Sequence, residues 1–243
     1  MNLVLDIGNT RVKAALFNKD VLEQIEYFDS ENDVLNNLPF IRQAKKAIIG
    51  SVTGNPEGFL SELNALLPSQ LFSADSKTPL KNTYQSVSTL GSDRLAASVG
   101  AFTLYHDRDV LVVDAGTCIK YNFTNSANEY LGGGISPGLS MRFKALHAFT
   151  SKLPLVEADF GYNSLIGTNT THSILSGVLN GTVAEIEGTI SRYTEQYTDL
   201  ICVITGGDSE HFAKRLKKPI FTHQNLVLRG LNHILNCTNL YRE

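Results

Sequence analysis

The sequence predicts an α/β protein built from two similar halves, in which strands come first and helices follow. Apolar runs rich in β-branched residues end in glycine-containing turns at residues 2–7 and again at 110–118. Segments with helical spacing of apolar residues follow in each half, one from Pro56 and one from about Thr170. With 243 residues and 42% hydrophobic composition, the chain is long enough to bury a sizeable core.

The first half begins with a predicted antiparallel meander of three strands separated by turn signals. Those strands are expected at residues 2–7, 11–17 and 21–28. A short apolar run at 45–52 predicts a buried strand. Pro56 lies at a favourable early position of an amphipathic helix. Ser92 has the right residue type to cap a second helix.

The second half repeats this order from residue 110. Strands are expected at 110–118, 119–123, 129–135 and 200–207. Helices are expected from Pro137 to about Thr150, from 170 to 197, from Asp208 or Ser209, and from 225 to 240. Gly177, Gly181 and Gly188 weaken the helical pattern of the long 170–197 segment.

The two halves carry the same kind of turn at the same place. Each has an acid, a glycine and a threonine at the end of a buried strand, as Asp6-Ile7-Gly8-Asn9-Thr10 and as Asp114-Ala115-Gly116-Thr117. This repeat indicates an internal duplication, with one domain at 1–108 and the other at 109–243. Since no Pro- or Ser-rich linker separates them, the halves are expected to pack around a cleft.

The repeated turn suits phosphate binding. A glycine turn after a buried strand presents backbone N–H groups to anions, and Asn9, Thr10 and Thr117 add neutral donors. An aspartate at the strand end can serve a hard cation that bridges to phosphate, and Lys13 adds a positive charge. A plain β-hairpin is the alternative for one such turn, because such turns also form for conformational reasons alone. Two turns at equivalent places favour phosphate binding.

The bulk properties exclude several classes of function. The formal net charge is −3 and 19% of residues are charged, so no basic excess favours nucleic acid. No run approaches the roughly 18 apolar residues of a membrane span, and the apolar start is too short for a signal segment. Three widely spaced cysteines lack metal-ligand spacing and fit a reducing compartment. We expect a cytoplasmic protein with neither nucleic acid nor membrane as partner.

Seven segments together resemble the motifs of type III pantothenate kinases, in the order that this family has them. The DxGNT and DxGT turns alone are shared with sugar kinases and actin-like ATPases, whereas the ordered set is far more specific. The matching segments are Asp6–Lys13 (DIGNTRVK), Gly91–Arg94 (GSDR), Asp114–Thr117 (DAGT), Gly132–Gly138 (GGGISPG), Thr150–Pro154, Gly167–Thr170 and Thr205–Asp208. Cys118 departs from the alanine that more commonly follows DxGT.

The resemblance implies duplicated actin-like (ribonuclease H-like) domains with mixed sheets flanked by helices and an active site in the interdomain cleft. It implies ATP-dependent phosphorylation of pantothenate to 4′-phosphopantothenate, the first step of coenzyme A biosynthesis. It implies Mg²⁺ with ATP and a monovalent cation, K⁺ or NH₄⁺. It also implies a homodimer whose pantothenate pocket is completed by the partner subunit.

Carried over residue by residue, the resemblance implies these roles. Asp93 would be the catalytic base, Asp114 would bind the monovalent cation, and Asp6 would hold Mg²⁺, directly or through water. The expected ATP and phosphate ligands are Asp6, Gly8, Asn9, Thr10, Lys13, Gly116, Thr117, Gly206 and Gly207. The expected substrate contacts are Tyr84, Gly91, Ser92, Asp93, Arg94 and, from the partner, Thr170. Arg94 suits a carboxylate because its planar fork can bind both oxygens.

Three other functions are weighed against this one. A kinase for another small acceptor, such as a sugar, would leave Arg94 without an obvious carboxylate to bind. An actin-like ATPase or phosphatase would use water as the acceptor. A non-enzymatic regulatory relative would be expected to lose its acids or Lys13, yet Asp6, Lys13, Asp93 and Asp114 are all present.

Overall fold

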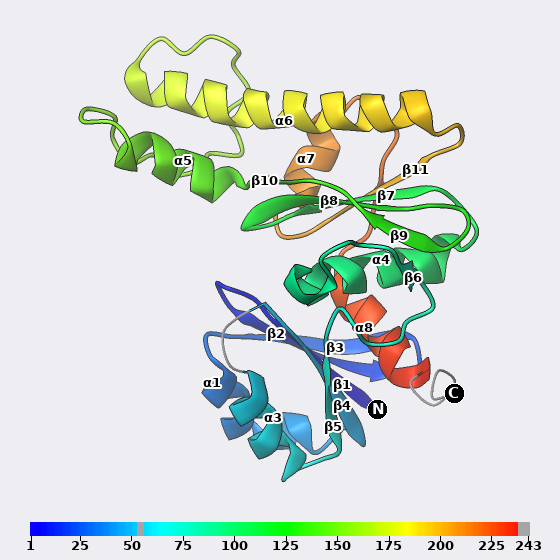
Figure 1. Ribbon diagram of the computed structural model, residues 1–243. Helices are drawn as coiled ribbons and strands as arrows, with labels where there is room; N and C mark the ends of the chain where they lie inside the picture. The colour runs from blue at the N-terminus through cyan, green and yellow to red at the C-terminus, as the bar shows by residue number, and fades with distance from the viewer. Residues whose placement is uncertain (53–55, 238–243) are drawn as a thin grey trace. The chain divides into compact units, whose positions relative to one another are not determined.

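The structure is a computed structural model that describes residues 1–52 and 56–237. Its helices and strands are shown in Figure 1, and helices flank two sheets within these residues. The strands are β1 (Asn2–Ile7), β2 (Val12–Asn18), β3 (Val21–Phe28), β4 (Lys46–Ser51), β5 (Ser69–Phe72), β6 (Lys81–Asn82), β7 (Val110–Ala115), β8 (Cys118–Thr124), β9 (Glu129–Gly132), β10 (Ile135–Pro137), β11 (Ile201–Thr205) and β12 (Phe221–Thr222). The helices are α1 (Glu31–Asn36), α2 (Leu38–Ile41), α3 (Pro56–Asn64), α4 (Ser92–Tyr105), α5 (Leu139–Ala148), α6 (Thr170–Gln196), α7 (Ser209–Arg215) and α8 (Leu226–Cys237), with a 3₁₀ turn η1 (Val87–Thr89).

The two sheets repeat one strand order. The first has the order β3-β2-β1-β4-β5, and the second has β6-β9-β8-β7-β11-β12 with β10 also paired to β8. Taken in chain order, strands β1, β2, β3, β4 and β5 of the first sheet correspond to β7, β8, β9, β11 and β12 of the second. With this correspondence the two sheets have the same order of strands, and the second sheet has β6 in addition, next to β9. In both sheets the central strand ends in the predicted aspartate and glycine turn. In both, that strand pairs in parallel with its neighbour, β4 or β11.

The chain forms two compact units that are not continuous in sequence. Unit 1 contains 1–108, 122–132 and 225–243, and unit 2 contains 109–121 and 133–224. Residues 53–55 and 238–243 lie outside the described part, and so does the end of the helix expected at 225–240. These units are defined by contacts within the structure, whereas the predicted domains at 1–108 and 109–243 are repeats of sequence; that domain division stays a prediction.

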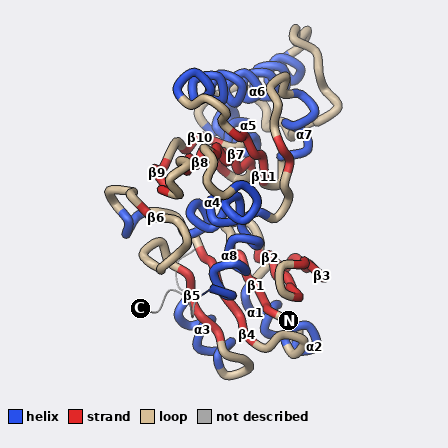
Figure 2. The backbone as a smooth tube through the Cα atoms, turned by 90° about the vertical axis from the view of Figure 1, so that its right-hand side faces the viewer, coloured by secondary structure: helices blue, strands red, loops and turns tan. Residues whose placement is uncertain are grey.

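Unit 1 has a core on each face of its sheet, because successive side chains of a strand point to opposite sides. Leu3 and Leu5 pack with residues of α1, α2 and α3, whereas Val4 and Ile48 pack with residues of α4 and α8. Figures 1 and 2 show α1 and α3 on one face and α4 and α8 on the other. This sandwich fixes the ends of β1 and β4, where the first turn lies.

Unit 2 is built around β7, whose residues are all buried, and the long helix α6. Glu185 of α6 accepts a hydrogen bond from the Tyr121 hydroxyl of β8 at 3.0 Å, and it pairs with Arg142 of α5. Burial and the nearby Glu185 carboxylate raise the pKa of the Tyr121 hydroxyl. These contacts tie α5 and α6 to β8, which leads back to the second turn.

Most of the expected elements are confirmed, including the N-terminal meander, the helix from Pro56 and the long helix from Thr170. Two expected helix starts are wrong. Ser92 is not the cap of α4, because Gly91 takes that position and the Ser92 hydroxyl bonds elsewhere. Pro137 does not open α5, because it ends β10 and pairs with Cys118 of β8, and the helix starts at Leu139. None of the described helices has the length and apolar character that crossing a bilayer requires.

Candidate active site

The first turn joins β1 to β2 in unit 1. The register of this hairpin sets Asp6 opposite Lys13, and the Lys13 Nζ atom lies 4.0 Å from the Asp6 Oδ2 atom. The Gly8 N–H donates to the Arg11 carbonyl at 3.2 Å, which closes the turn. Asn9 is exposed at its tip. The carboxylate and the ammonium group are therefore held side by side below a set of exposed polar groups.

The start of α4 lies at the same edge of the sheet. The Ser92 hydroxyl donates to the Ser51 carbonyl at 2.9 Å, and Ser51 pairs with Ile7 at the end of β1. Asp93 is the next residue, and its Oδ1 atom lies close to Gly91. A Cβ added to Gly91 would lie 2.6 Å from this oxygen. The structure therefore brings the first turn and the GSDR segment to one edge of unit 1.

Arg94 is almost fully buried, at 4% exposure. Its Nε donates to the Asn122 Oδ1 atom at 2.8 Å, and the same oxygen accepts a bond from the Tyr130 hydroxyl at 3.1 Å. The guanidinium lies 5.5 Å from the centre of the Tyr84 ring. Its Nη2 atom has no hydrogen-bond partner among the described residues. Because a buried charge is costly unless it is paired, this arrangement suits an anionic ligand.

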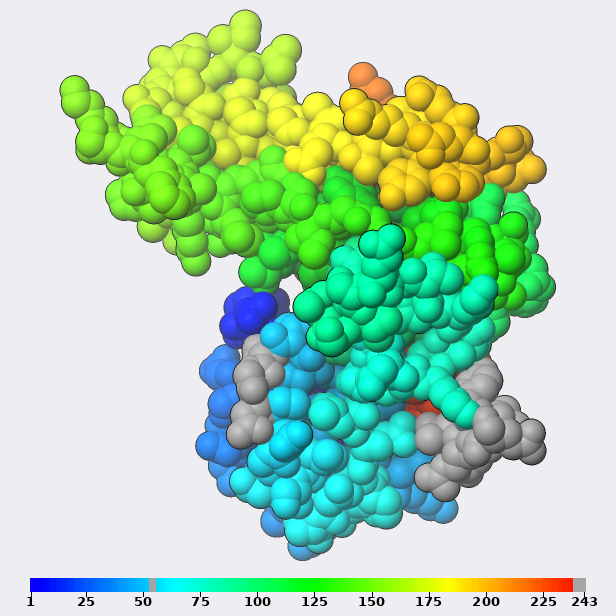
Figure 3. Space-filling view, viewed as in Figure 1, coloured from blue at the N-terminus to red at the C-terminus, as the bar shows by residue number. Residues whose placement is uncertain are grey.

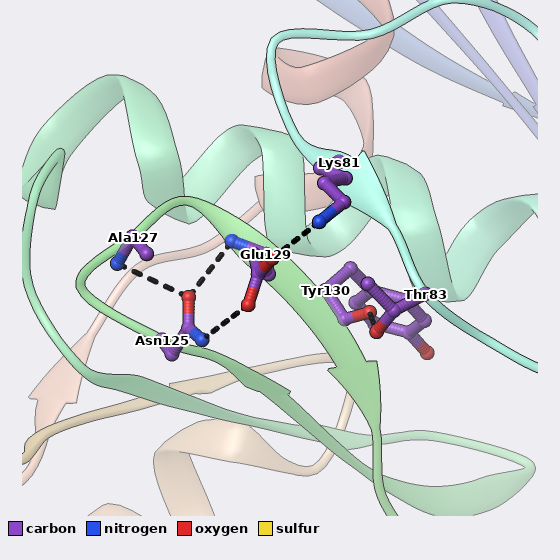
Figure 4. A network of polar contacts seen from close by, with 6 residues as sticks. All are labelled: Lys81, Thr83, Asn125, Ala127, Glu129 and Tyr130. Carbon is purple, nitrogen blue, oxygen red and sulfur yellow. Dashed lines mark hydrogen bonds and ion pairs between the residues drawn. The ribbon is translucent and has the colours of Figure 1, made fainter.

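The strand that carries Tyr130 is fixed by a polar network, which Figure 4 shows from close by. Lys81 of β6 pairs with Glu129 of β9 at 2.7 Å, and the Thr83 hydroxyl donates to the Tyr130 carbonyl at 2.8 Å. Asn125 donates to a carboxylate oxygen of Glu129 at 3.0 Å. These contacts hold the Tyr130 side chain where it can orient Asn122, and through it Arg94.

The second turn follows β7 in unit 2, and backbones approach it closely from two sides. The Gly138 N–H donates to the Thr117 carbonyl at 3.1 Å, and a Cβ on Gly138 would lie 2.2 Å from the Gly116 carbonyl oxygen. Gly206 has φ +96°, and a Cβ there would lie 2.2 Å from the Ala115 carbonyl oxygen. Only glycine fits such approaches, so the turn is a packed cradle of backbone groups.

Asp114 forms a short ion pair in this cradle. The Lys120 Nζ atom lies 3.0 Å from its Oδ2 atom, and the two side chains are 21% and 10% exposed. Its Oδ1 atom faces Gly206, because a Cβ on that glycine would come within 2.7 Å of it. The Oδ2 atom is therefore paired with a lysine of unit 2 itself, and the Oδ1 atom lies close to the Gly206 backbone.

Thr170 is the first residue of α6, and it is exposed. The side chain of Asn169 caps the helix by accepting a bond from the His172 N–H at 2.9 Å. Within unit 2 the structure gathers Asp114, Gly116, Thr117 and Gly206 around one cradle. Within unit 1 it gathers the first turn with Gly91–Asp93. That the two sets face one another stays a prediction.

The described residues contain no cluster of three or more His, Cys, Asp or Glu side chains suited to a metal. Asp6 is a partly buried carboxylate beside the first turn, which is predicted to bind phosphate. It fits a Mg²⁺ ion that keeps several waters and takes most other ligands from phosphates. Asp114 does not fit a monovalent cation, because an ammonium group already occupies its Oδ2 atom.

Sequence reasoning missed three residues of these sites: Lys120, Asn122 and Tyr130. Lys120 had a usable signal, because it follows the second turn as Lys13 follows the first, six residues after Asp114 rather than seven after Asp6. Asn122 had none, because its bond to Arg94 spans 28 residues, and Tyr130 had none, because it supports Arg94 only through Asn122.

Solved structures with the same fold are sugar kinases and related proteins. A Campylobacter jejuni protein described as a Baf family transcriptional activator matches with a TM-score of 0.66 at 20% identity, covering 98% of this chain and 99% of that one. A ROK family glucokinase from Streptomyces griseus, in complex with glucose and AMPPNP, matches with a TM-score of 0.54 at 11% identity, covering 96% and 98%. These likenesses confirm the predicted actin-like fold, the class to which the two turns also point.

A sequence model of the type III pantothenate kinase family matches residues 2–192. The type III pantothenate kinase of Bacteroides fragilis is 44% identical over 244 residues, covering 98% of this chain and 99% of its own. That of Christiangramia forsetii is 41% identical over 241 residues, covering 97% and 98%. The chain belongs to the type III pantothenate kinase family, so the resemblance expected from its motifs is confirmed.

Proposed function

We propose that the chain transfers the γ-phosphoryl group of ATP to the hydroxyl group of pantothenate, giving ADP and 4′-phosphopantothenate for coenzyme A biosynthesis. The observation that carries this proposal is the pair at the start of α4. Asp93 lies at the sheet edge beside the first turn, and next to it Arg94 is a buried guanidinium whose Nη2 atom lacks a hydrogen-bond partner among the described residues. The carboxylate of pantothenate supplies the anion that Arg94 suits.

In this reaction the hydroxyl oxygen of pantothenate bonds to the γ-phosphorus while the bond to the bridging oxygen breaks and ADP leaves. Asp93 accepts the hydroxyl proton on its carboxylate. Lys13 and the N–H groups of the two turns would hold phosphate oxygens, and Asp6 would hold Mg²⁺. The chemistry that such an ion would supply there is neutralisation of phosphate charge. Since phosphoryl transfer has a loose transition state, positioning and charge supply most of the catalysis.

Tyr84, Asn122 and Tyr130 support the acceptor site by holding Arg94 in place. Gly206 and Gly207 follow β11, the parallel neighbour of β7, which suits contacts with the nucleotide. A kinase for a sugar would use the same phosphate turns. It would give no task to a buried guanidinium, so pantothenate is the better acceptor.

The enzyme acts as a homodimer in the cytoplasm, in which Thr170 of each subunit reaches the pantothenate site of its partner. The exposed surface of unit 2 supports this assembly. Gly177, Gly181 and Gly188 lie on α6, and a Cβ on any of them would meet no atom of another described segment within 4 Å, so a second helix could approach closely. Leu165 and Ile166 are 78% and 75% exposed in the loop before α6. Figure 3 shows this loop and α6 as one continuous surface of unit 2.

The test is an ADP-release assay with ATP and Mg²⁺, run with pantothenate, with glucose and with no acceptor, and with the product identified by mass spectrometry. Only pantothenate should stimulate ADP release. Asp93→Asn should keep the fold and lower kcat by roughly 100-fold or more, since a positioned base contributes that much. Glu62→Gln, an exposed change on α3, is the matched control.

Activity with glucose alone would replace pantothenate by a sugar, and release that ignores every acceptor would indicate an ATPase. Light scattering with size exclusion tests the dimer. Gly181→Arg should yield monomers whose KM for pantothenate rises, whereas a monomeric wild-type enzyme would contradict the role of Thr170.

A further inference from the structure

Asp114 is the residue expected to bind a monovalent cation, but in the structure the side chain of Lys120 lies next to its carboxylate. Asp114 ends β7, and its Oδ2 atom lies 3.0 Å from the Lys120 ammonium nitrogen. A separate K⁺ or NH₄⁺ ion bound to this oxygen would need the same place. Two like charges that close repel strongly where burial limits screening. The carboxylate therefore already has its cation, and that cation is covalently part of the chain.

The backbone fixes where Lys120 lies. Lys120 is on β8, where it pairs with Ile135 of β10 in an antiparallel ladder, and its neighbour Ile119 pairs with Ser136. Its side chain is 79% buried. The backbone of Lys120 is held in a paired strand and its side chain is mostly buried, so the ion pair with Asp114 belongs to the built site.

The first half of the chain offers an independent parallel. There the Lys13 ammonium lies 4.0 Å from Asp6, again across the turn that follows a central strand. Both halves thus place a lysine from the returning strand next to the aspartate at the strand end. The second pair is the shorter and the more buried one.

We infer that the Lys120 ammonium group takes the place of a bound potassium or ammonium ion at Asp114, so that this kinase works without a monovalent cation. Lys120 neutralises Asp114, so no repulsive carboxylate faces the nucleotide phosphates that the adjoining cradle is proposed to bind. The inference rests on the proposed phosphorylation of pantothenate only for its kinetic readout. The binding of a cation to the site can be measured without any turnover.

The experiment compares wild type, Lys120→Ala and Lys120→Met in equal concentrations of choline, potassium and ammonium chloride. Wild-type kcat/KM for ATP should change by less than about twofold between the salts, since ionic strength is constant. Lys120→Ala should lose roughly 100-fold in choline, as when one charge-stabilising group is removed, and regain most of it in potassium or ammonium. Lys120→Met fills the space that Ala opens, so it should lose activity without rescue.

Binding of thallium(I), a potassium substitute, is followed by its own NMR signal. Lys120→Ala should bind it and melt at a higher temperature in potassium than in choline, because a ligand that binds only the folded state stabilises it. Wild type should do neither. Lys144→Ala on the exposed part of α5 is the matched control and should behave as wild type.

A wild-type enzyme that needs potassium or ammonium, or that binds thallium at Asp114, overturns the inference. So does a Lys120→Ala variant that loses activity and neither recovers in any salt nor binds thallium, because Lys120 would then act directly on phosphate. If no phosphopantothenate forms in any salt, the proposed function fails, and the thallium comparison still decides the cation question. Should Lys120→Ala fail to fold, the wild-type measurements decide it.

Discussion

The two strand-end turns share a sequence pattern but differ in how they are held. In the first, a Cβ on Gly8 would lie 3.4 Å from the Arg11 carbonyl oxygen, which is an ordinary contact, and the Lys13 Nζ atom lies 4.0 Å from Asp6. In the second, Gly138 and Gly206 pack so closely on backbone carbonyls that a Cβ on either would lie 2.2 Å from a carbonyl oxygen, and the Lys120 Nζ atom lies 3.0 Å from Asp114. The first turn is thus an open hairpin, whereas the second is locked by its neighbours.

For the phosphate binding proposed above, this difference predicts that the two turns play different roles. An open turn with a loosely paired lysine can adjust its donors to a phosphate that moves during the reaction. A locked turn whose carboxylate is paired with a lysine can hold the part of the nucleotide that stays in place. Variants of the paired residues should therefore have different consequences in the two halves.

The largest expected effect separates the two lysines. Lys13→Met should lower kcat/KM by roughly 100- to 1,000-fold, because it removes a charge proposed to act on phosphates. Unlike Lys120→Ala, Lys13→Ala should recover nothing in ammonium or potassium. Steady-state kinetics in matched salts measure this, with Lys45→Met on the exposed surface of the same unit as the control. Rescue of Lys13→Ala by ammonium would make the two turns equivalent and end the comparison.

The next effect tests the locking of the second turn through stability. Gly206→Ala should destabilise the fold by about 3 kcal/mol, because φ +96° is strained for alanine and the Cβ would lie 2.2 Å from the Ala115 carbonyl oxygen. Gly207→Ala is the matched control, since its Cβ would meet no atom of the described residues within 4 Å, and it should cost less than about 1 kcal/mol. Gly8→Ala in the first turn should also be mild. Urea unfolding measures all three, and equal losses for Gly206→Ala and Gly207→Ala would refute the lock.

The strands and turns could be predicted from sequence because their signals are local. The apolar runs at 2–7 and 110–115, each ending in an aspartate and a glycine, specify a buried strand and the turn after it. The two wrong helix starts fail for a non-local reason. The Ser92 hydroxyl is drawn away from the helix end by the Ser51 carbonyl, and Pro137 is held in a strand by its pairing with Cys118.

The candidate site divides in the same way. Asp6, Lys13, Asp93 and Arg94 could be found because their motifs are contiguous in the chain. The support of Arg94 by Asn122 and Tyr130 could not, because 28 residues separate Arg94 from Asn122 and no pattern reports such a contact. Lys120 could have been predicted as the counterpart of Lys13. It follows its aspartate by six residues rather than seven, so the two lysines do not align when the two turn motifs are compared position by position.

A smaller effect concerns how the first turn is joined to α4. Ser92→Ala should cost about 1 kcal/mol, because it removes the hydrogen bond to the Ser51 carbonyl at the end of β4. Ser98→Ala is a sharp control in the same helix. Ser98 is 1% exposed and its hydroxyl has no partner among the described residues, so its loss should be neutral or slightly stabilising. Urea unfolding of both variants tests this, and a greater loss for Ser98→Ala would show that burial, not the bond, decides.

The smallest expected effect lies beside the second turn and depends on pH. Burial raises the pKa of the Asp208 carboxyl above its ordinary value, so the folded state disfavours its ionised form. The resulting penalty is absent below the ordinary carboxyl pKa and complete above the raised one. Asp208→Asn should therefore stabilise the fold at neutral pH, by less than about 1 kcal/mol because the group is partly exposed to solvent. Melting curves from acid to neutral pH should show this gain shrinking as pH falls, with exposed Glu195→Gln unchanged. A gain that grows toward acid pH would contradict this prediction, because the folded state would then favour the ionised form of Asp208.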